Sequence, residues 1–166
     1  MTKVFVLLLF VSFYKVSFSQ ENKEKCNIEP FEVFTEDNDD FSNIRADPQG
    51  TIILKLNNKH SYGYMLNVID MKDGWMKINT VTGVDGIDIS NFEGWIHNSI
   101  VGATVTHDVR VYDKPNSKNM VGELIGEQHT FKIKEAYCEW IKIECKSLVG
   151  WVKSEQICGN PVTTCP

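Results

Sequence analysis

The sequence contains one series of short motifs twice, in the same order. The hexamer DGWMKI (residues 73–78) recurs as CEWIKI (138–143). Three further pairs accompany it: NIRADP (43–48) with DVRVYDKP (108–115), two residues being inserted; TIILKL (51–56) with NMVGEL (119–124); and GWIHNSIVG (94–102) with GWVKSEQICG (150–159), one residue being inserted. Chance supplies one such match easily but hardly four in register. A repeat of this kind indicates one supersecondary unit built twice, of about 60 residues each time.

The apolar residues of the first repeat come in short runs separated by turn residues. We expect strands at Ile52–Leu56, Met65–Ile69, Met76–Thr80 and Trp95–Ile96, with Asp-Pro, Asn-Asn and Lys-Asp-Gly between them. No window of about eleven residues keeps helical periodicity. The pattern predicts an all-β fold, with two small barrels or sandwiches joined near residues 102–107. The expected core of the first one is Ile44, Ile53, Leu56, Ile69, Ile78 and Ile96.

Trp75 raises a question about surface exposure. Successive side chains of a strand point to opposite faces. Met76 and Ile78 form the apolar set that suits the core, so Trp75 is expected to face solvent. The same parity holds at Trp140, where Ile141 and Ile143 form the inward set.

The first nineteen residues have the parts of a secretory signal: Lys3, an apolar run at 4–13, and Ser17-Phe18-Ser19. The run is shorter than the about 20 apolar residues of a spanning helix. A buried N-terminal helix or strand is the alternative. We expect cleavage after Ser19, which removes Lys3 and Lys15 and no acid, so the formal charge falls from −5 to −7. That charge argues against nucleic acid or anionic lipid as a partner. We therefore expect a secreted or periplasmic protein that is not inserted in a membrane after cleavage.

These motifs resemble those of bacterial Src-homology-3 (SH3b) domains. In the first repeat they are Asn43-Ile44-Arg45 with Pro48, Asp73-Gly74-Trp75-x-Lys77-Ile78 and Gly94-Trp95-Ile96-His97-x-Ser99; in the second they are Val109-Arg110 with Pro115, Trp140-x-Lys142-Ile143 and Gly150-Trp151-Val152. The second repeat departs from the pattern at Glu139, in place of the turn glycine, and has no Asn before Val109. The resemblance implies two tandem half-open barrels, at 31–102 and 107–157, after an N-terminal segment (20–30) and before a tail (158–166).

The resemblance also implies where a ligand would bind. In eukaryotic members of this fold, the tryptophan at the start of the corresponding strand lies on the ligand surface. The matching residues here are Trp75 and His97 in the first repeat and Trp140 and Lys153 in the second. Tyr62 and Tyr64, from the YGY stretch, are expected near Trp75. The alternative is that each tryptophan packs over a barrel edge or between the domains.

The sequence offers no convincing catalytic or metal centre. The four histidines (His60, His97, His107 and His129) have no metal-ligand spacing to another His or Cys, and no nucleophile elbow or phosphate loop is present. The acidic stretch 36–40 and the pair Asp85 and Asp88 lack EF-hand spacing and suit solvated loops. The two repeats take up nearly all of the sequence after the signal. We therefore expect no enzyme and no cofactor.

Two functions remain open at this point. One is a binding module of the bacterial cell envelope, which reads peptidoglycan peptides or extended protein segments through aromatic residues in a groove. The other is an inhibitor or immunity-type protein that blocks a secreted enzyme or toxin. Both would use surface aromatic residues.

Five cysteines in an exported chain indicate disulfides, with one cysteine left over. Cys138 and Cys145 lie about 20 Å apart if the strand between them is extended, too far for a bond that needs Cα atoms within about 7 Å. Either of them could pair with Cys26 instead, and the sequence leaves that choice open.

We predict a disulfide between Cys158 and Cys165, because Gly-Asn-Pro between them can turn the chain back. Closing so short a loop contributes roughly 2–3 kcal/mol. Mass spectrometry of a non-reduced digest, on protein secreted by its own host, is expected to show the linked peptides. Finding both cysteines as free thiols would refute the pair.

Overall fold

The computed structural model describes residues 26–60, 63–83, 88–125 and 130–160, and the expected signal (1–19) lies outside them. These residues form β-strands and three short 3-10 helices, and no α-helix. The strands are β1 (Phe31–Thr35), β2 (Phe41–Arg45), β3 (Ile52–Asn57), β4 (Tyr64–Lys72), β5 (Trp75–Gly83), β6 (Asp88–Ile89), β7 (Gly94–His97), β8 (Val101–Gly102), β9 (Val109–Tyr112), β10 (Met120–Leu124), β11 (Lys132–Tyr137), β12 (Trp140–Cys145) and β13 (Leu148–Lys153). The 3-10 helices are η1 (Asn58–His60), η2 (Asn98–Ile100) and η3 (Ser154–Gln156). The predicted all-β class is confirmed. No helix in the described part of the chain is long and apolar enough to cross a bilayer.

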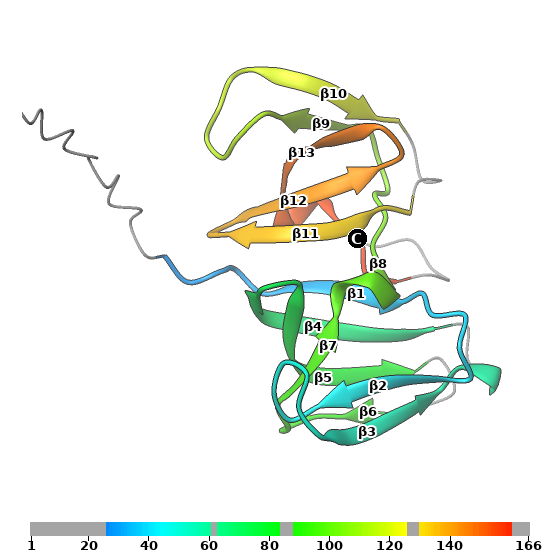
Figure 1. Ribbon diagram of the computed structural model, residues 1–166. Coiled ribbons are helices and arrows are strands. Elements are labelled where there is room, and N and C mark those ends of the chain that lie inside the picture. The colour runs from blue at the N-terminus through cyan, green and yellow to red at the C-terminus, as the bar shows by residue number, and fades with distance from the viewer. Residues whose placement is uncertain (1–25, 61–62, 84–87, 126–129, 161–166) are drawn as a thin grey trace, which may run out of the picture.

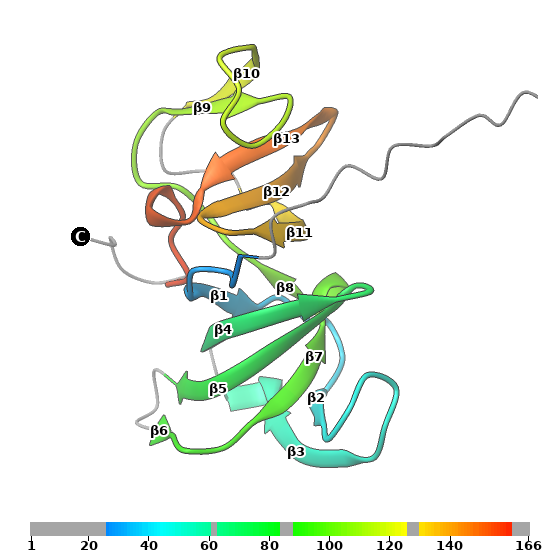
Figure 2. The same ribbon diagram turned by 90° about the vertical axis from the view of Figure 1, so that its left-hand side faces the viewer.

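The two repeats form two sheets with the same strand order. The order is β3-β2-β7-β5-β4 in the first unit and β10-β9-β13-β12-β11 in the second, and all of these pairs are antiparallel. β1 and β8 continue the first sheet beyond β4 and lie between the two units in both views (Figures 1 and 2). β6 pairs with β5 alone. The repeat therefore has a structural counterpart, while the predicted closure of each unit into a half-open barrel stays a prediction.

The strand pairings correct one alignment between the repeats. Leu56 pairs with Ser42, and its counterpart Leu124 pairs with Val109. From the other side, Trp95 pairs with Arg45 and Trp151 pairs with Tyr112. Both relations align Asn43, Ile44 and Arg45 of the first unit with Arg110, Val111 and Tyr112 of the second. The predicted two-residue insertion is wrong, because the two segments align without a gap as far as the loops, where Gln49 and Asn116 both have positive φ.

Two β-bulges recur in both units, and both wrong core assignments fall on them. The pairing of β4 with β5 skips Ile69, and the pairing of β11 with β12 skips Lys134 at the matching position. A bulge leaves its extra residue unpaired, and Ile69 has the opposite parity to the buried Leu66 and Val68, so it is only half-buried. The β2–β3 pairing likewise skips Ile53, which is 48% exposed instead of lying in the core.

The remaining predicted core residues are buried as expected. Ile44, Ile78 and Ile96 are fully buried, and Leu56 is 2% exposed. Their counterparts in the second unit, Val111, Ile143, Val152 and Leu124, are buried too. Each unit thus has buried apolar side chains at matching positions on one face of its sheet.

The connection between the units is a set of backbone bridges. Ala103 pairs with Phe131 and Thr104 pairs with Cys158, so the linker after β8 lies against the second unit. The side chain of Asn98 donates to the carbonyl of Ile133 at 3.0 Å. Lys132 and Glu36 form a salt bridge with 2.6 Å between Nζ and Oε2. The two units consequently pack against one another through β8, η2 and β11.

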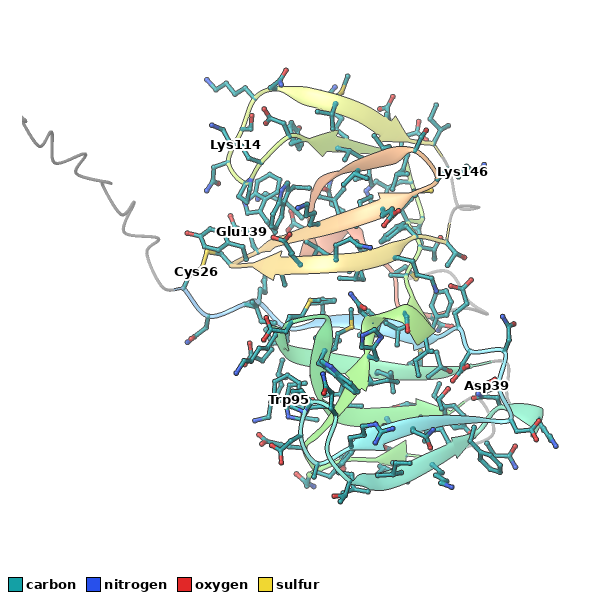
Figure 3. The ribbon with its side chains drawn as sticks, in the orientation of Figure 1. Cys26, Asp39, Trp95, Lys114, Glu139 and Lys146 are labelled. Atoms are coloured by element: carbon teal, nitrogen blue, oxygen red, sulfur yellow. A yellow bond between two sulfur atoms is a disulfide. The ribbon has the colours of Figure 1, made fainter. Side chains whose placement is uncertain are left out.

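The segment before β1 is fastened to the second unit. Cys26 and Cys138 form a disulfide, which decides the pairing that the sequence left open, and Cys145 is free and buried. Figure 3 shows Cys26 beside Glu139 at the turn between β11 and β12. Glu29 adds two hydrogen bonds, from its N–H to the Cys138 carbonyl and from the Ser154 hydroxyl to its carboxylate. Cys165 lies outside the described residues, so its pairing with Cys158 stays a prediction.

We predict that Ile78→Asp unfolds the first unit, because an unpaired carboxylate in the core costs several kcal/mol, a large share of a total stability of about 5–15 kcal/mol. Ile53→Asp is the matched control, with the same substitution at an exposed bulge of the same unit. It is expected to change the free energy of unfolding by about 0.5 kcal/mol. Denaturant titration followed by circular dichroism measures both. Wild-type stability in Ile78→Asp would contradict the core assignment.

Candidate functional site

Each unit holds a tryptophan at the same place, directly after the turn of its central hairpin. Trp75 opens β5 and pairs with His97, and Trp140 opens β12 and pairs with Lys153. The backbone around them is also repeated. The N–H of Asn98 donates to the Gly74 carbonyl at 2.9 Å, as that of Ser154 donates to the Glu139 carbonyl at 2.8 Å. The structure therefore brings together the two residues predicted for the site in each repeat.

In the first unit, the Trp75 ring is partly exposed and packs against His97. The two ring centroids lie 5.0 Å apart, with the planes at 76°. His97 Nδ1 accepts the backbone N–H of Ser99 at 3.3 Å. In the neutral ring, Nε2 therefore carries the proton and is available as a donor. An aromatic ring beside an imidazole donor suits an apolar ligand group with an acceptor next to it.

The two predicted tyrosines do not join this pair. Tyr64 is 1% exposed and lies on the inward face of β4. Its hydroxyl donates to the carbonyl of Asn57 at 3.0 Å, at the end of β3. The prediction of Tyr64 as a groove residue is wrong, because its parity is that of the buried residues of β4. Tyr62 lies outside the described residues.

In the second unit, Trp140 is covered, contrary to the expectation from strand parity. It is 5% exposed, although Ile141 and Ile143 take the inward face as predicted. The Tyr112 ring meets it edge-on at 5.8 Å, and Lys153 Nζ lies 5.9 Å from its ring centroid. The first unit has Arg45 in the position of Tyr112, and its guanidinium donates to the Gly50 carbonyl at 2.7 Å instead. Trp75 therefore lacks the aromatic cover that Trp140 has.

A cavity of about 470 Å³ opens over this part of the second unit. Its lining residues are Asp108, Arg110, Tyr112, Glu123, Trp140, Lys153 and Gln156. The volume lies within the range of about 300–1,000 Å³ that small-ligand sites occupy. Of these residues, only Trp140 and Lys153 were predicted as site residues. The gapless alignment of the repeats is the signal that would have placed Arg110 and Tyr112 next to them.

The two basic side chains of the cavity have weak ionic partners or none among the described residues. The Arg110 guanidinium makes no hydrogen bond or ion pair with any described residue, although Glu123 lies directly opposite Arg110 on β10. Lys153 Nζ lies 4.0 Å from a Glu155 oxygen and 5.9 Å from the centroid of the Trp140 ring. Exposed ion pairs contribute little to stability, so these side chains are available to a ligand at small cost.

The indole N–H of Trp140 is buried and has no acceptor in the described part of the chain. A buried donor without a partner costs roughly 1–3 kcal/mol. The residue lines the cavity, while its indole nitrogen itself is buried beneath the surface.

A second hollow of about 460 Å³ continues the first one. Arg110 and Tyr112 line both, and Ser117, Lys118 and Met120 line the second alone. The loop between β9 and β10, marked by Lys114 in Figure 3, frames it. Hydrogen bonds from Ser117 and Asn119, together with the charge of Lys114, lower the pKa of Asp113. The carboxylate thus orders this loop, and the two hollows form one groove along β9.

The described residues offer no group of three or more His, Cys, Asp or Glu that could hold a metal ion. Asp85 lies outside them. Two of the described cysteines are joined in the Cys26–Cys138 disulfide, and the thiol of Cys145 is buried.

Comparisons with known proteins add little. No model of a known protein family matches the chain, and no curated protein matches it. Among solved structures, the chain is similar to NlpC1 and NlpC2 from Trichomonas vaginalis, at 10% identity, with TM-scores of 0.33 and 0.31 and coverage of 78% of this chain. The chain spans about half the length of both, 46% of NlpC1 and 48% of NlpC2. Similarity at this level assigns neither a family nor an activity.

The two tryptophans are expected to differ in what they contribute to stability. Trp140→Ala removes a buried ring and should lower the free energy of unfolding by about 3–5 kcal/mol. Trp75→Ala removes a partly exposed ring and should lower it by about 1 kcal/mol. Urea denaturation of the two variants beside wild type measures both. Equal, large losses would show that Trp75 is a packing residue.

Proposed function

We propose that the protein is a non-catalytic, exported binding module of the bacterial cell envelope. Its ligand is a peptidoglycan peptide or an extended protein segment. The observation that carries the proposal is the groove along β9, whose wall combines the rings of Tyr112 and Trp140 with an Arg110 guanidinium that has no partner among the described residues.

The chemistry of this groove suits a peptide better than a compact apolar molecule. Tyr112 and Trp140 provide aromatic surface, with polar groups on the same side chains. Arg110, Lys153 and Glu123 present charges of both signs along the rim. An extended peptide offers alternating side chains to such pockets, and its backbone offers acceptors to the unpaired donors. The Trp75–His97 pair supplies a second, less covered surface in the first unit.

The Cys26–Cys138 disulfide supports the expectation of export. Disulfides persist in oxidising compartments and are rare in the cytosol. This one joins residues 112 positions apart, so reduction would release the segment before β1 from the second unit.

Co-sedimentation with purified sacculi, beside pull-down from envelope extract, tests the proposal. Wild-type protein is expected to pellet with sacculi and to be displaced by soluble muropeptides. Trp75→Ala and Tyr112→Ala each remove an aromatic anchor, which is worth about 2 kcal/mol or roughly thirtyfold in affinity. Both variants should remain folded and bind more weakly.

Phe41→Ala is the matched control, because Phe41 is an aromatic residue 43% exposed on β2, outside both proposed surfaces. It should bind as wild type does. Failure of wild type to bind sacculi, with tight capture of one protein from the extract, would replace this function by that of an inhibitor.

A further inference from the structure

We infer that the cavity of the second unit binds the free carboxyl end of a peptide. The inference rests on the proposed function and narrows its ligand to a chain terminus. Arg110 and Lys153 bind the terminal carboxylate of the peptide. The side-chain carboxylates of Asp108 and Glu123 accept the N–H of its last peptide bond.

The two cations lie on neighbouring strands of one face. β9 and β13 are antiparallel, with Tyr112 paired to Trp151. In the same register, Arg110, two residues before Tyr112, lies beside Lys153, two residues after Trp151. Both line the cavity, and Arg110 has no partner among the described residues. A guanidinium next to an ammonium is suited to a carboxylate, which Arg binds through two parallel hydrogen bonds.

The acidic side chains make the site selective for a ligand that carries both a carboxylate and an N–H donor. Asp108 and Glu123 line the same cavity. Their negative charge would repel a phosphate dianion more than a single carboxylate. The last residue of a peptide carries a carboxylate and, one atom beyond Cα, an N–H donor. This pair of groups matches a cavity that is lined by both cations and acids.

The groove favours a peptide over a free amino acid. The second hollow continues past Arg110 and Tyr112 to Lys118 and Met120, which leaves room for preceding residues. A free amino acid would leave this second hollow empty.

The first unit shows that this chemistry is not part of the shared scaffold. By the strand pairings, Asn43 takes the place of Arg110, and Lys55 takes the place of Glu123. The first unit therefore has a neutral amide where the second has the unpaired guanidinium. Asn is compatible with this strand position, so Arg110→Asn is a variant that should fold.

Calorimetric titration of the full protein with two peptides tests the inference. The probes are N-acetyl-trialanine with a free carboxyl group and its carboxyl amide. Wild type is expected to bind the acid at least about tenfold more tightly than the amide. Arg110→Asn should lose about as much affinity for the acid and keep its affinity for the amide. Lys55→Gln, which also removes one positive charge, is the control and should bind as wild type does.

Several results would overturn the inference. They are equal binding of acid and amide, no binding of either at millimolar concentration, wild-type affinity in Arg110→Asn, or free alanine bound as tightly as the acetylated peptide. The proposed function fails separately. Sacculi bound equally by wild type and Arg110→Asn would leave the function standing without this site. Peptide acid bound by a protein that ignores sacculi would leave the site without that function.

Discussion

Each unit depends on one bulged antiparallel hairpin, β4–β5 in the first and β11–β12 in the second. Strand alternation decides which side chains enter the core, and a bulge changes that alternation at one position. With the bulge at Ile69 or Lys134, the apolar residues on both sides of it still face the core. Ile78 and Ile143 are then buried, and the tryptophan after the turn falls on the other face. The paired strands, the matching cores and the position of the site all follow from this register.

The units pack together along the β1 and β8 side of the first sheet. β4 is extended by β1 and β8, and β8 leads into the linker that bridges to Phe131 and Cys158. The N-terminal segment returns to the second unit through Cys26 and Glu29. Covalent and backbone links at both ends of the contact restrict hinge motion between the units. The groove along β9 is lined by residues of the second unit alone.

Much of this architecture could be predicted from the repeat, because matching motifs in order indicate one fold built twice. The pairs Trp75 with His97 and Trp140 with Lys153 were expected from the resemblance of these motifs to those of SH3b domains. The errors on the strands concern parity. Tyr64 shares the parity of the buried Leu66 and Val68, whereas Ile69 has the opposite parity, as Ile53 has to Leu56. Both isoleucines lie at bulges that no glycine or proline marks. The misplaced insertion hid Tyr112, whose ring covers Trp140 through a contact between strands that are distant in sequence.

The residues that differ between the units determine the chemistry of the surface, whereas the residues that match determine the fold. Residues that match in both units are mainly core isoleucines, valines and leucines, turn residues and the hairpin tryptophan, all of which the register requires. The outward positions beside that tryptophan are free of this requirement, and there the units diverge: Arg45 against Tyr112, and Lys55 against Glu123. In the first unit the arginine is bound to its own loop, and the tryptophan stays partly exposed. In the second, a tyrosine covers the tryptophan, and the guanidinium of Arg110 has no partner among the described residues. A scaffold that fixes the place of a site but not its side chains can hold two different ligand groups at equivalent positions of one chain.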